Sequence, residues 1–185
     1  QHYLDELNEI HSRIAEHGVQ ITRCISNSED LKKPHQLIVF TDASNQALGT
    51  CVYLRCPELR KAHLLLAKSA LADPEMTIPK KELTAIVMGA DVAKFLHREL
   101  SMTVNITEVL LFTDNAACVG LLKRPSVAKG TFFRNRIQKM TAIARDFEIN
   151  DITFFFGHVD TKENVADITT RSYLDNTHWW NGPLF

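Results

Sequence analysis

The sequence predicts an α/β fold built on a mixed five-stranded sheet. In it, a three-strand antiparallel meander precedes parallel β/α units, and helices lie on both faces. Three short β-rich apolar runs with short connections fill residues 36–68, and helical and strand patterns alternate after Pro79. The chain has 185 residues, of which 45% are apolar and 23% charged. These values are typical of one globular domain and exclude a disordered, collagen-like or disulfide-stapled protein.

The amino-terminal part, residues 1–34, is predicted to be an appendage to this domain. An amphipathic helix is expected over residues 3–18 and a short strand over 19–25. The apolar positions of that helix are Leu4, Leu7, Ile10 and Ile14. The polar stretch 27–34 is interpreted as a linker, so the main domain is expected to span residues 35–185.

Nine segments of the main domain carry strand or helix patterns, in the order β-β-β-α-β-α-α-β-α. Apolar β-rich runs predict strands at residues 36–41, 50–55, 62–68, 109–113 and 152–156. Apolar residues at helical spacing predict helices at residues 79–99, 115–123, 130–147 and 163–174. Pro79 suits the first turn of the long helix, and an aromatic tail follows at 175–185.

Charge and cysteine content limit the classes of function. With 21 basic and 22 acidic residues, the net charge of −1 does not by itself favour nucleic acid as a partner. The four cysteines lack a C-x-x-C pair or zinc-type spacing, which favours reduced thiols in a reducing compartment. Neither a signal-like segment nor an apolar run of roughly 18 residues occurs, so we expect no membrane association.

Four acids stand where their chemistry is informative. Asp42 and Asp114 each end a β-rich run, Glu82 lies one turn into the long helix, and Asp167 lies near the start of the last helix. Ligands collect at strand ends of open α/β sheets, and two acids close together there repel each other unless a cation joins them. Mg²⁺ binds such hard oxygen ligands, and two ions ~4 Å apart can clamp an in-line phosphoryl displacement.

Each acid also has an ordinary structural interpretation, which the residues taken singly leave open. Asp42 can form an Asx-turn, Asp114 can cap the following helix, and Glu82 can be a first-turn acid favoured by the helix dipole. Asp167 can be a surface or capping acid. The joint pattern is much less frequent by chance than any one of its members.

The motifs around these acids resemble one known family. The segments VFTDAS, KKELTA, LLFTDNAA and NVADITTR are similar to the ribonuclease H fold with its Asp-Glu-Asp-Asp metal set. The run AKSALADPEMTIPKKELTAIVMGADVAKFL, together with ITRCI, HVDTKENVADITTR and WWNGPLF, resembles the ribonuclease H domain of BEL/Pao-type LTR retrotransposon polyproteins. That domain lies between a reverse transcriptase and an integrase. The resemblance therefore implies that residues 1–34 are a remnant of the reverse transcriptase connection, and explains why the chain starts with Gln1 rather than Met.

The resemblance assigns roles to individual residues. It implies that Asp42, Glu82, Asp114 and Asp167 are catalytic ligands of two Mg²⁺ ions, with Mn²⁺ as a substitute. His158 matches the flexible histidine of many such enzymes, although a surface-loop histidine is an equal alternative. Two positions depart from the family pattern: Lys81 stands where an apolar residue is usual, and Val165 replaces the proline of NPAD. Neither change removes a ligand.

A nucleic-acid surface is expected on the second half of the domain. Seven basic residues and no acid lie between Asn115 and Arg145, and such a patch suits phosphate contacts, although a solvated helix face is the alternative. The candidate nucleic-acid-binding residues are Ser44, Asn45, Asn115, Arg134, Arg136 and Lys139. The RNA 2′-hydroxyl would distinguish the two strands of a hybrid here.

The resemblance implies a divalent-metal-dependent endoribonuclease that hydrolyses the RNA strand of RNA/DNA hybrids during reverse transcription. The expected partners are the hybrid and the reverse transcriptase domain of the same polyprotein, in a cytoplasmic retroelement particle and without a small-molecule cofactor. Two alternatives stay open. One is a domesticated, non-catalytic module that binds a protein or an RNA, and the other is a connection domain that only holds the hybrid.

Overall fold

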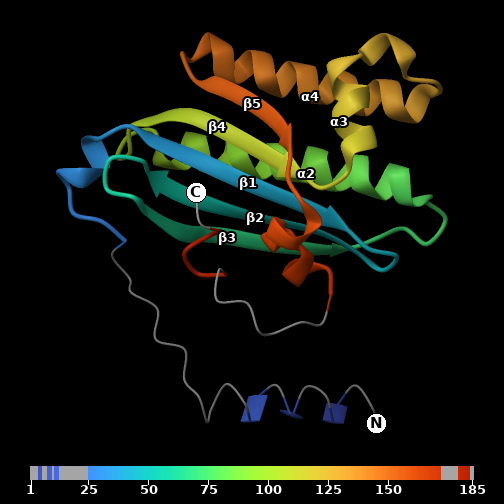
Figure 1. Ribbon diagram of the computed structural model, residues 1–185, viewed down its shortest axis with the longest axis horizontal. Helices are drawn as coiled ribbons and strands as arrows, with labels where there is room; N and C mark the ends of the chain where they lie inside the picture. The colour runs from blue at the N-terminus through green and yellow to red at the C-terminus, as the bar shows by residue number, and fades with distance from the viewer. Residues whose placement is uncertain (1–3, 6–7, 10, 13–24, 172–178, 184–185) are drawn as a thin grey trace.

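The computed structural model describes residues 4–5, 8–9, 11–12, 25–171 and 179–183, and its centre is one five-stranded sheet (Figure 1). The strands are β1 (His35–Ala43), β2 (Ala47–Cys56), β3 (Lys61–Leu71), β4 (Ile106–Thr113) and β5 (Thr153–His158). They are arranged in the order β3-β2-β1-β4-β5. The first three pair antiparallel, whereas β4 pairs parallel with both β1 and β5. The predicted meander with parallel units is therefore confirmed.

β1 is the central strand and is buried on both faces. Leu37 and Val39 point into the larger core, whereas Ile38 and Phe40 point into a smaller core on the opposite face. A strand covered on both sides reads as a continuous apolar run rather than as an alternation. This explains why residues 36–41 were recognisable as a strand from composition alone.

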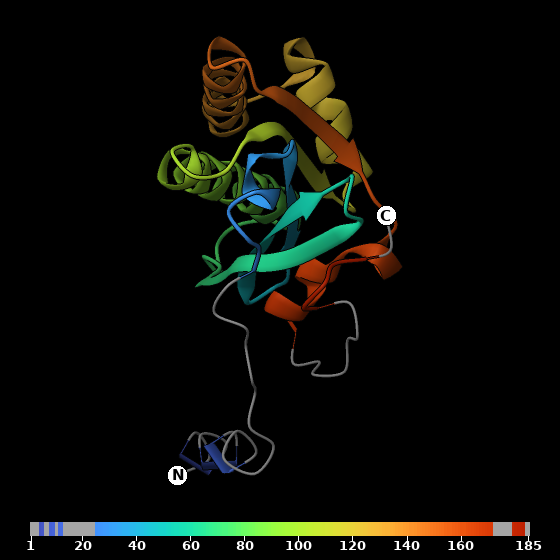
Figure 2. The same ribbon diagram turned by 90° about the vertical axis from the view of Figure 1, so that its left-hand side faces the viewer.

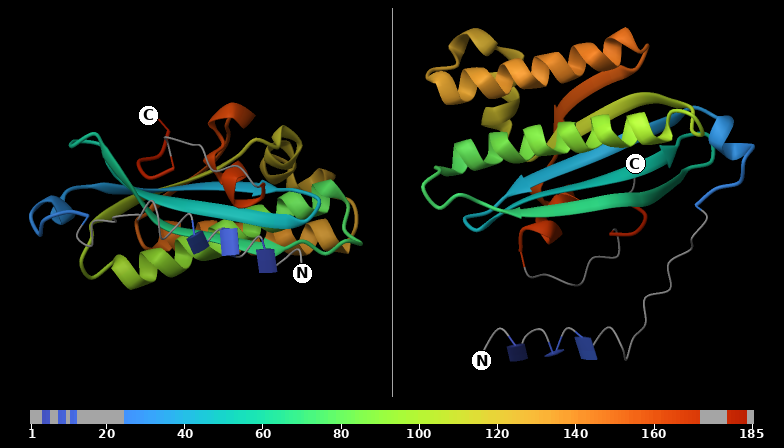
Figure 3. Two further views of the ribbon diagram at one scale, coloured as in Figure 1. Left: turned by 90° about the horizontal axis from the view of Figure 1, so that it is seen from below. Right: turned by 180° about the vertical axis from the view of Figure 1, so that it is seen from behind.

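Three α-helices contribute to the larger core: α2 (Ile78–Leu100), α3 (Ala116–Lys123) and α4 (Thr131–Ile149). Figure 3 shows α2 and α4 on the same side of the sheet. α2 begins after Thr77 with Pro79 in its first turn, as expected. Gly89 allows this helix to cross close to β1, because a Cβ there would lie 2.4 Å from Thr41 Cγ2. No helix in the described part of the chain is long and apolar enough to cross a membrane.

The opposite face is covered by residues that follow β5, among them the 3-10 helix η4 (Val165–Thr169), which comes after the exposed 3-10 helix η3 (Thr161–Glu163) (Figure 2). The α-helix expected over residues 163–174 is therefore corrected to short 3-10 turns, and residues 172–178 lie outside the described residues. The segment from Asn164 to Thr169 is hydrogen-bonded to the sheet at both ends. Asn164 Nδ2 donates to Thr41 O (3.1 Å), and Ser69 Oγ donates to Thr169 O (2.5 Å). These anchors favour tight turns over a longer helix.

The aromatic tail is described at residues 179–183, where it packs on the smaller core. Trp179 contributes to that core, and its carbonyl accepts a hydrogen bond of 2.7 Å from the hydroxyl of Tyr53. The carbonyl of Trp180 accepts from the backbone N–H of Leu64 at 3.0 Å. The segment is therefore fixed to β2 and β3.

The polar stretch 27–34 differs from the expected linker. It contains the 3-10 helix η1 (Asp30–Lys32), and the carbonyl of Leu31 accepts from the N–H of Asn105 at 3.0 Å. Leu31 also packs against the larger core, so this stretch is attached to the domain. The helix expected over residues 3–18 and the strand over 19–25 fall largely outside the described residues, and the domain division at residue 35 stays a prediction.

Candidate metal centre

The parallel pairing of β1 and β4 brings two acids to one edge of the sheet. Thr41 lies opposite Thr113 in the register, so the residues that follow them, Asp42 and Asp114, stand side by side at the carboxyl ends of the two strands. Asp42 is only 2% exposed, and Asp114 is partly buried. This edge is where open α/β sheets bind ligands.

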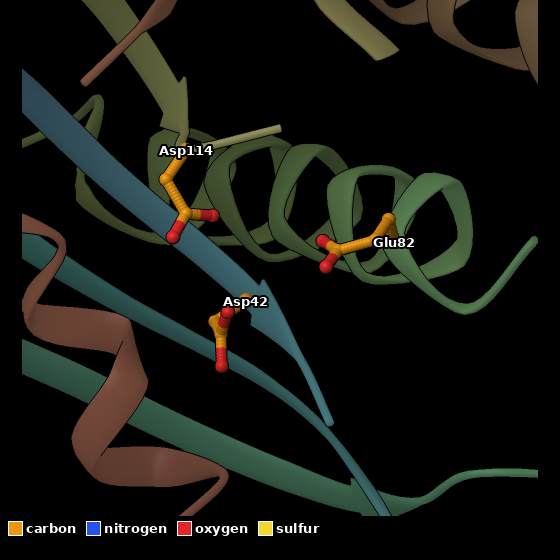
Figure 4. Close-up of side chains that lie close together, drawn as sticks. All are labelled: Asp42, Glu82 and Asp114. Atoms are coloured by element: carbon orange, nitrogen blue, oxygen red, sulfur yellow. The ribbon is translucent and has the colours of Figure 1, made fainter. Parts of the chain in front are cut away.

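α2 adds a third acid to the same place. Glu82 is 7% exposed, and its side chain extends from the helix toward the strand ends (Figure 4). One carboxylate oxygen from each of Asp42, Glu82 and Asp114 lies within 4.8 Å of the other two. We call these three residues the acid triad.

Burial and mutual repulsion both disfavour negative charge in the acid triad. Burial, together with the charges of Asp42 and Asp114, raises the pKa of Glu82 to about 8. Burial also raises the pKa of Asp42, against the effect of a hydrogen bond from Thr170. Among the described residues, no group hydrogen-bonds to the buried Glu82 Oε2. An orphaned oxygen that faces two further carboxylates fits a hard divalent cation such as Mg²⁺.

The raised pKa of Glu82 makes the stability of the metal-free protein depend on pH. The folded state binds the proton of Glu82 more tightly than the unfolded state does. Protonated Glu82 therefore contributes its full stabilisation of the fold below the ordinary carboxyl pKa, and this contribution is lost as the pH rises through about 8. We expect the free energy of unfolding to fall by about 2–4 kcal/mol between about pH 5 and pH 9. Urea titrations in chelator measure this change.

Two comparisons identify the source of that slope. Glu82→Gln, which is isosteric and uncharged, should flatten the pH dependence in this window. Excess Mg²⁺ should restore stability at the alkaline end, because it binds the folded state and neutralises the ionised carboxylates. An unchanged slope in Glu82→Gln would show that Glu82 titrates near its ordinary value.

Asp167 lies beside the acid triad but outside the set of mutually close oxygens. It belongs to η4, and its charge raises the pKa of Asp42, which places the two carboxylates within electrostatic reach. Asp167 Oδ1 lies 2.9 Å from Arg171 Nε in an ion pair one turn along the chain. Next to this pair, the hydroxyl of Thr170 donates to Asp42 Oδ2.

His158, at the end of β5, lies at the rim of the site. It is exposed, and its Nε2 lies 3.1 Å from the carbonyl oxygen of Asp114. The His158 ring therefore contacts the backbone of Asp114 and is otherwise exposed to solvent. Both sequence interpretations, the flexible histidine of such enzymes and a surface-loop histidine, are compatible with this position.

The turn between β1 and β2 carries two of the candidate nucleic-acid ligands. Ser44 Oγ accepts from the N–H groups of Gln46 (3.2 Å) and Ala47 (3.0 Å), so it shapes the turn. The carbonyl of Asn45 accepts from Lys81 Nζ at 2.7 Å. Lys81 is only 4% exposed, and this hydrogen bond explains how a lysine is accommodated at a buried position.

Asn115 has a structural role that the sequence assigned to its neighbour. It is the N-cap of α3, and its side-chain oxygen accepts from the N–H of Cys118 at 3.0 Å. Asp114 therefore does not cap this helix, and its carboxylate is available to the acid triad. The cap uses the side-chain oxygen of Asn115 and not its Nδ2 amide.

The basic residues of the second half lie on α3, α4 and the segment between them. All are exposed except Arg136, which is partly buried. Arg136 Nε donates to Thr84 Oγ1 (3.0 Å), and its guanidinium lies 3.5 Å from the centre of the Phe132 ring. Lys139 is paired with Asp91 on α2 (2.5 Å). Arg134 is exposed on α4, so the three candidates on this helix have different surroundings.

A cavity of about 630 Å³ lies beside two of these basic residues. It lies between β3, α2 and α4, and both Arg136 and Lys139 line it. None of the acid triad lines this cavity. Arg136 and Lys139 therefore border a different surface from the carboxylates, although Thr84 follows Glu82 by two positions on the same helix.

Three residues of the site were not assigned from the sequence: Asn164, Thr170 and Arg171. All belong to the motif NVADITTR, so their proximity to Asp167 was the available signal. Their contacts depend on how the segment folds back across β1 and β2, which neither periodicity nor charge reveals.

Comparison with known structures supports the fold. The N-terminal ribonuclease H domain of a Mycobacterium tuberculosis protein superposes with a TM-score of 0.53 at 15% identity, over 74% of this chain and 91% of that chain. LC11-RNase H1 in complex with an RNA/DNA hybrid superposes with a TM-score of 0.53 at 17% identity, over 73% of this chain and 92% of that chain. RNase H1 from Halobacterium salinarum superposes with a TM-score of 0.52 at 11% identity, over 74% of this chain and 93% of that chain. No curated protein matches the sequence.

The sequence itself matches one family model. The match extends over residues 1–115, and this range contains all three residues of the acid triad. Family and fold agree with each other, since the solved structures named above are ribonuclease H domains. The chain thus belongs to the Pao retrotransposon-like RNaseH-like domain family.

Proposed function

We propose that this domain is a divalent-metal-dependent endoribonuclease that hydrolyses the RNA strand of RNA/DNA hybrids during reverse transcription of a retroelement. The observation that carries the proposal is the acid triad with its orphaned Glu82 oxygen, at the ligand-binding edge of a ribonuclease H-like sheet. We further propose that the domain acts joined to the reverse transcriptase of its polyprotein, in a cytoplasmic particle.

The residues present suit two divalent ions, Mg²⁺ or Mn²⁺. Asp42, Glu82 and Asp114 would hold one ion, and Asp167 would join Asp42 on the second. When bound, the ions activate a water molecule and stabilise the leaving 3′ oxygen. The chain fixes its carboxylates through β1, β4 and α2, so that little reorganisation is needed during reaction. His158 at the rim can exchange a proton with solvent through its second ring nitrogen.

Binding of the hybrid is assigned to backbone contacts. The similar LC11-RNase H1 is described in complex with an RNA/DNA hybrid, which supports this class of substrate. The exposed basic residues on α3 and α4 can neutralise phosphates without reading sequence. Ser44, Asn45 and Asn115, which closely follow Asp42 or Asp114 in sequence, would contact sugars or bases near the cleaved bond.

A cleavage assay on the isolated domain tests the proposal. A labelled RNA/DNA hybrid should be cut in Mg²⁺ or Mn²⁺, and not in chelator, whereas double-stranded DNA and single-stranded RNA should stay intact. Hybrid binding without cleavage in either metal would instead support the connection role. Failure to bind the hybrid at low salt would favour a domesticated binding module.

Arg136→Ala is expected to weaken hybrid binding and to lower its salt dependence by about one phosphate contact. Saturated turnover should change less, because Arg136 lies outside the acid triad. The loss of the Phe132 stack and the Thr84 hydrogen bond should also lower the free energy of unfolding by about 1 kcal/mol. Hybrid affinity at several salt concentrations and urea unfolding measure both effects.

Arg98→Ala is the matched control for this change. Arg98 lies in the last turn of α2, exposed and paired with the adjacent Glu99, so its removal alters the net charge equally. Its salt dependence of binding should equal that of the unmodified protein. Equal salt dependence for Arg136→Ala and Arg98→Ala would contradict a phosphate contact at Arg136.

A further inference from the structure

The fourth carboxylate of the site already has a cation beside it. Arg171 Nε lies 2.9 Å from Asp167 Oδ1, and the backbone N–H of Arg171 donates to the carbonyl of the same aspartate at 3.1 Å. The turn of η4 thus fixes the arginine one turn after the acid. The side chain of Arg171 is 57% exposed, whereas that of Asp167 is 31% exposed.

Arg171 also acts on the carboxylates of the acid triad. Its positive charge lowers the pKa of both Asp42 and Glu82, opposing the effect of burial. Asp167 Oδ1 is shielded from solvent, and among the described residues it receives no hydrogen bond of good geometry despite the ionic contact. The arginine therefore neutralises part of the cluster without saturating the oxygen that it faces.

We propose that Arg171 is a resident counter-ion that occupies Asp167 in the metal-free protein and must release it before a divalent ion can join Asp167 to Asp42. The inference rests on the metal-binding part of the proposed function. A guanidinium stays protonated, so it cannot yield by losing a proton and has to move. Its exposure permits this movement, because the side chain borders an open hollow of about 580 Å³ beside the β1–β2 turn.

This competition sets the affinity for the ion that needs Asp167. A bound divalent ion and a fixed guanidinium repel each other, and the ion must also replace the ion pair. An uncharged side chain at position 171 removes both terms. An ion held by the acid triad alone should be affected less, since Arg171 contacts Asp167 rather than the triad.

The test is Mn²⁺ binding to the metal-free chain without nucleic acid, followed through the electron paramagnetic resonance signal of free Mn²⁺. Arg171→Gln should bind Mn²⁺ about five- to tenfold more tightly, as expected for loss of a partly exposed ion pair and its repulsion. Arg171→Lys keeps the charge and should stay near the unmodified protein. Arg98→Gln gives the same charge change at a distant exposed site and should have little effect.

A second pair of variants shows whether the gain passes through Asp167. In the Asp167→Asn background, Arg171→Gln should add much less affinity, because the carboxylate that it frees is absent and only the repulsion by its charge is relieved. The rise in melting temperature on adding Mn²⁺ gives an independent readout and should be larger for Arg171→Gln than for Arg98→Gln. Circular dichroism confirms that each variant is folded.

Two outcomes would overturn the inference: equal Mn²⁺ affinity in Arg171→Gln and Arg98→Gln, or an undiminished gain in the Asp167→Asn background. Neither depends on cleavage. Metal-dependent cleavage by the unmodified protein together with equal affinities would remove only the role of Arg171. A tighter Arg171→Gln site in a protein that cuts no hybrid would leave the counter-ion in place and remove the proposed function.

Discussion

Asp114→Asn is expected to lower the saturated rate of hybrid cleavage by about 100- to 1,000-fold, while hybrid binding persists or tightens. Asparagine keeps the shape of the side chain but removes one of the three negative charges that would hold an ion. Metal positioning acts on charge that develops during reaction, so the loss should fall mainly on turnover. Binding should not suffer, because one anion that faces the phosphates has been removed.

Single-turnover cleavage and hybrid affinity, measured together, check this result. Asp151→Asn is the matched control: Asp151 is exposed just before β5, at the opposite end of the strand from His158. It has a positive φ of 58°, which asparagine tolerates well. Normal saturated turnover in folded Asp114→Asn would contradict the proposed mechanism. The alternative that Asp114 caps a helix is already answered by Asn115, which is the N-cap of α3.

The parts of the site that lie on regular elements could be predicted from the sequence. Asp42 and Asp114 each end a long apolar run, and two such runs in a parallel sheet place their carboxyl ends together. Pro79 marks the first turn of an amphipathic helix, so the position of Glu82 one turn into that helix could also be predicted. Regular periodicity thus predicts which end of each element carries its acid, whereas the grouping of these acids into one metal set came from the resemblance of their motifs to a known family.

The parts that depend on irregular backbone could not be derived in this way. The segment after β5 forms short 3-10 turns rather than an α-helix, because Asn164 and Thr169 are tied to the sheet. The ion pair between Arg171 and Asp167, and the hydrogen bond from Thr170 to Asp42, follow from that path. The bonds to the sheet join residues far apart in sequence, and the Asp167–Arg171 ion pair, between residues four apart, depends on the turns that these bonds favour. Local propensity therefore does not predict them.

Gly49→Ala is expected to lower turnover by about 10- to 100-fold through displacement of this irregular segment. Gly49 lies on β2 opposite Asp42, and a Cβ there would lie 1.8 Å from Thr169 Oγ1 and 2.7 Å from Thr170 Cγ2. Rotation of Thr169 cannot relieve the overlap, since its own Cβ would be 2.9 Å away. Residues 165–171 must therefore shift outward, which moves Asp167 and the Thr170 hydroxyl away from Asp42.

The same overlap should lower the free energy of unfolding by about 1–3 kcal/mol, as is usual for overpacking. Gly120→Ala is the matched control, because nothing lies within 4 Å of a Cβ at that helical position. It should leave turnover unchanged and stabilise the protein slightly, since alanine favours a helix over glycine. Cleavage rate, Mn²⁺ affinity and urea unfolding of both variants separate the effects. If Gly49→Ala folds and keeps normal turnover and metal affinity, the segment that carries Asp167 has no part in catalysis, and the acid triad acts alone.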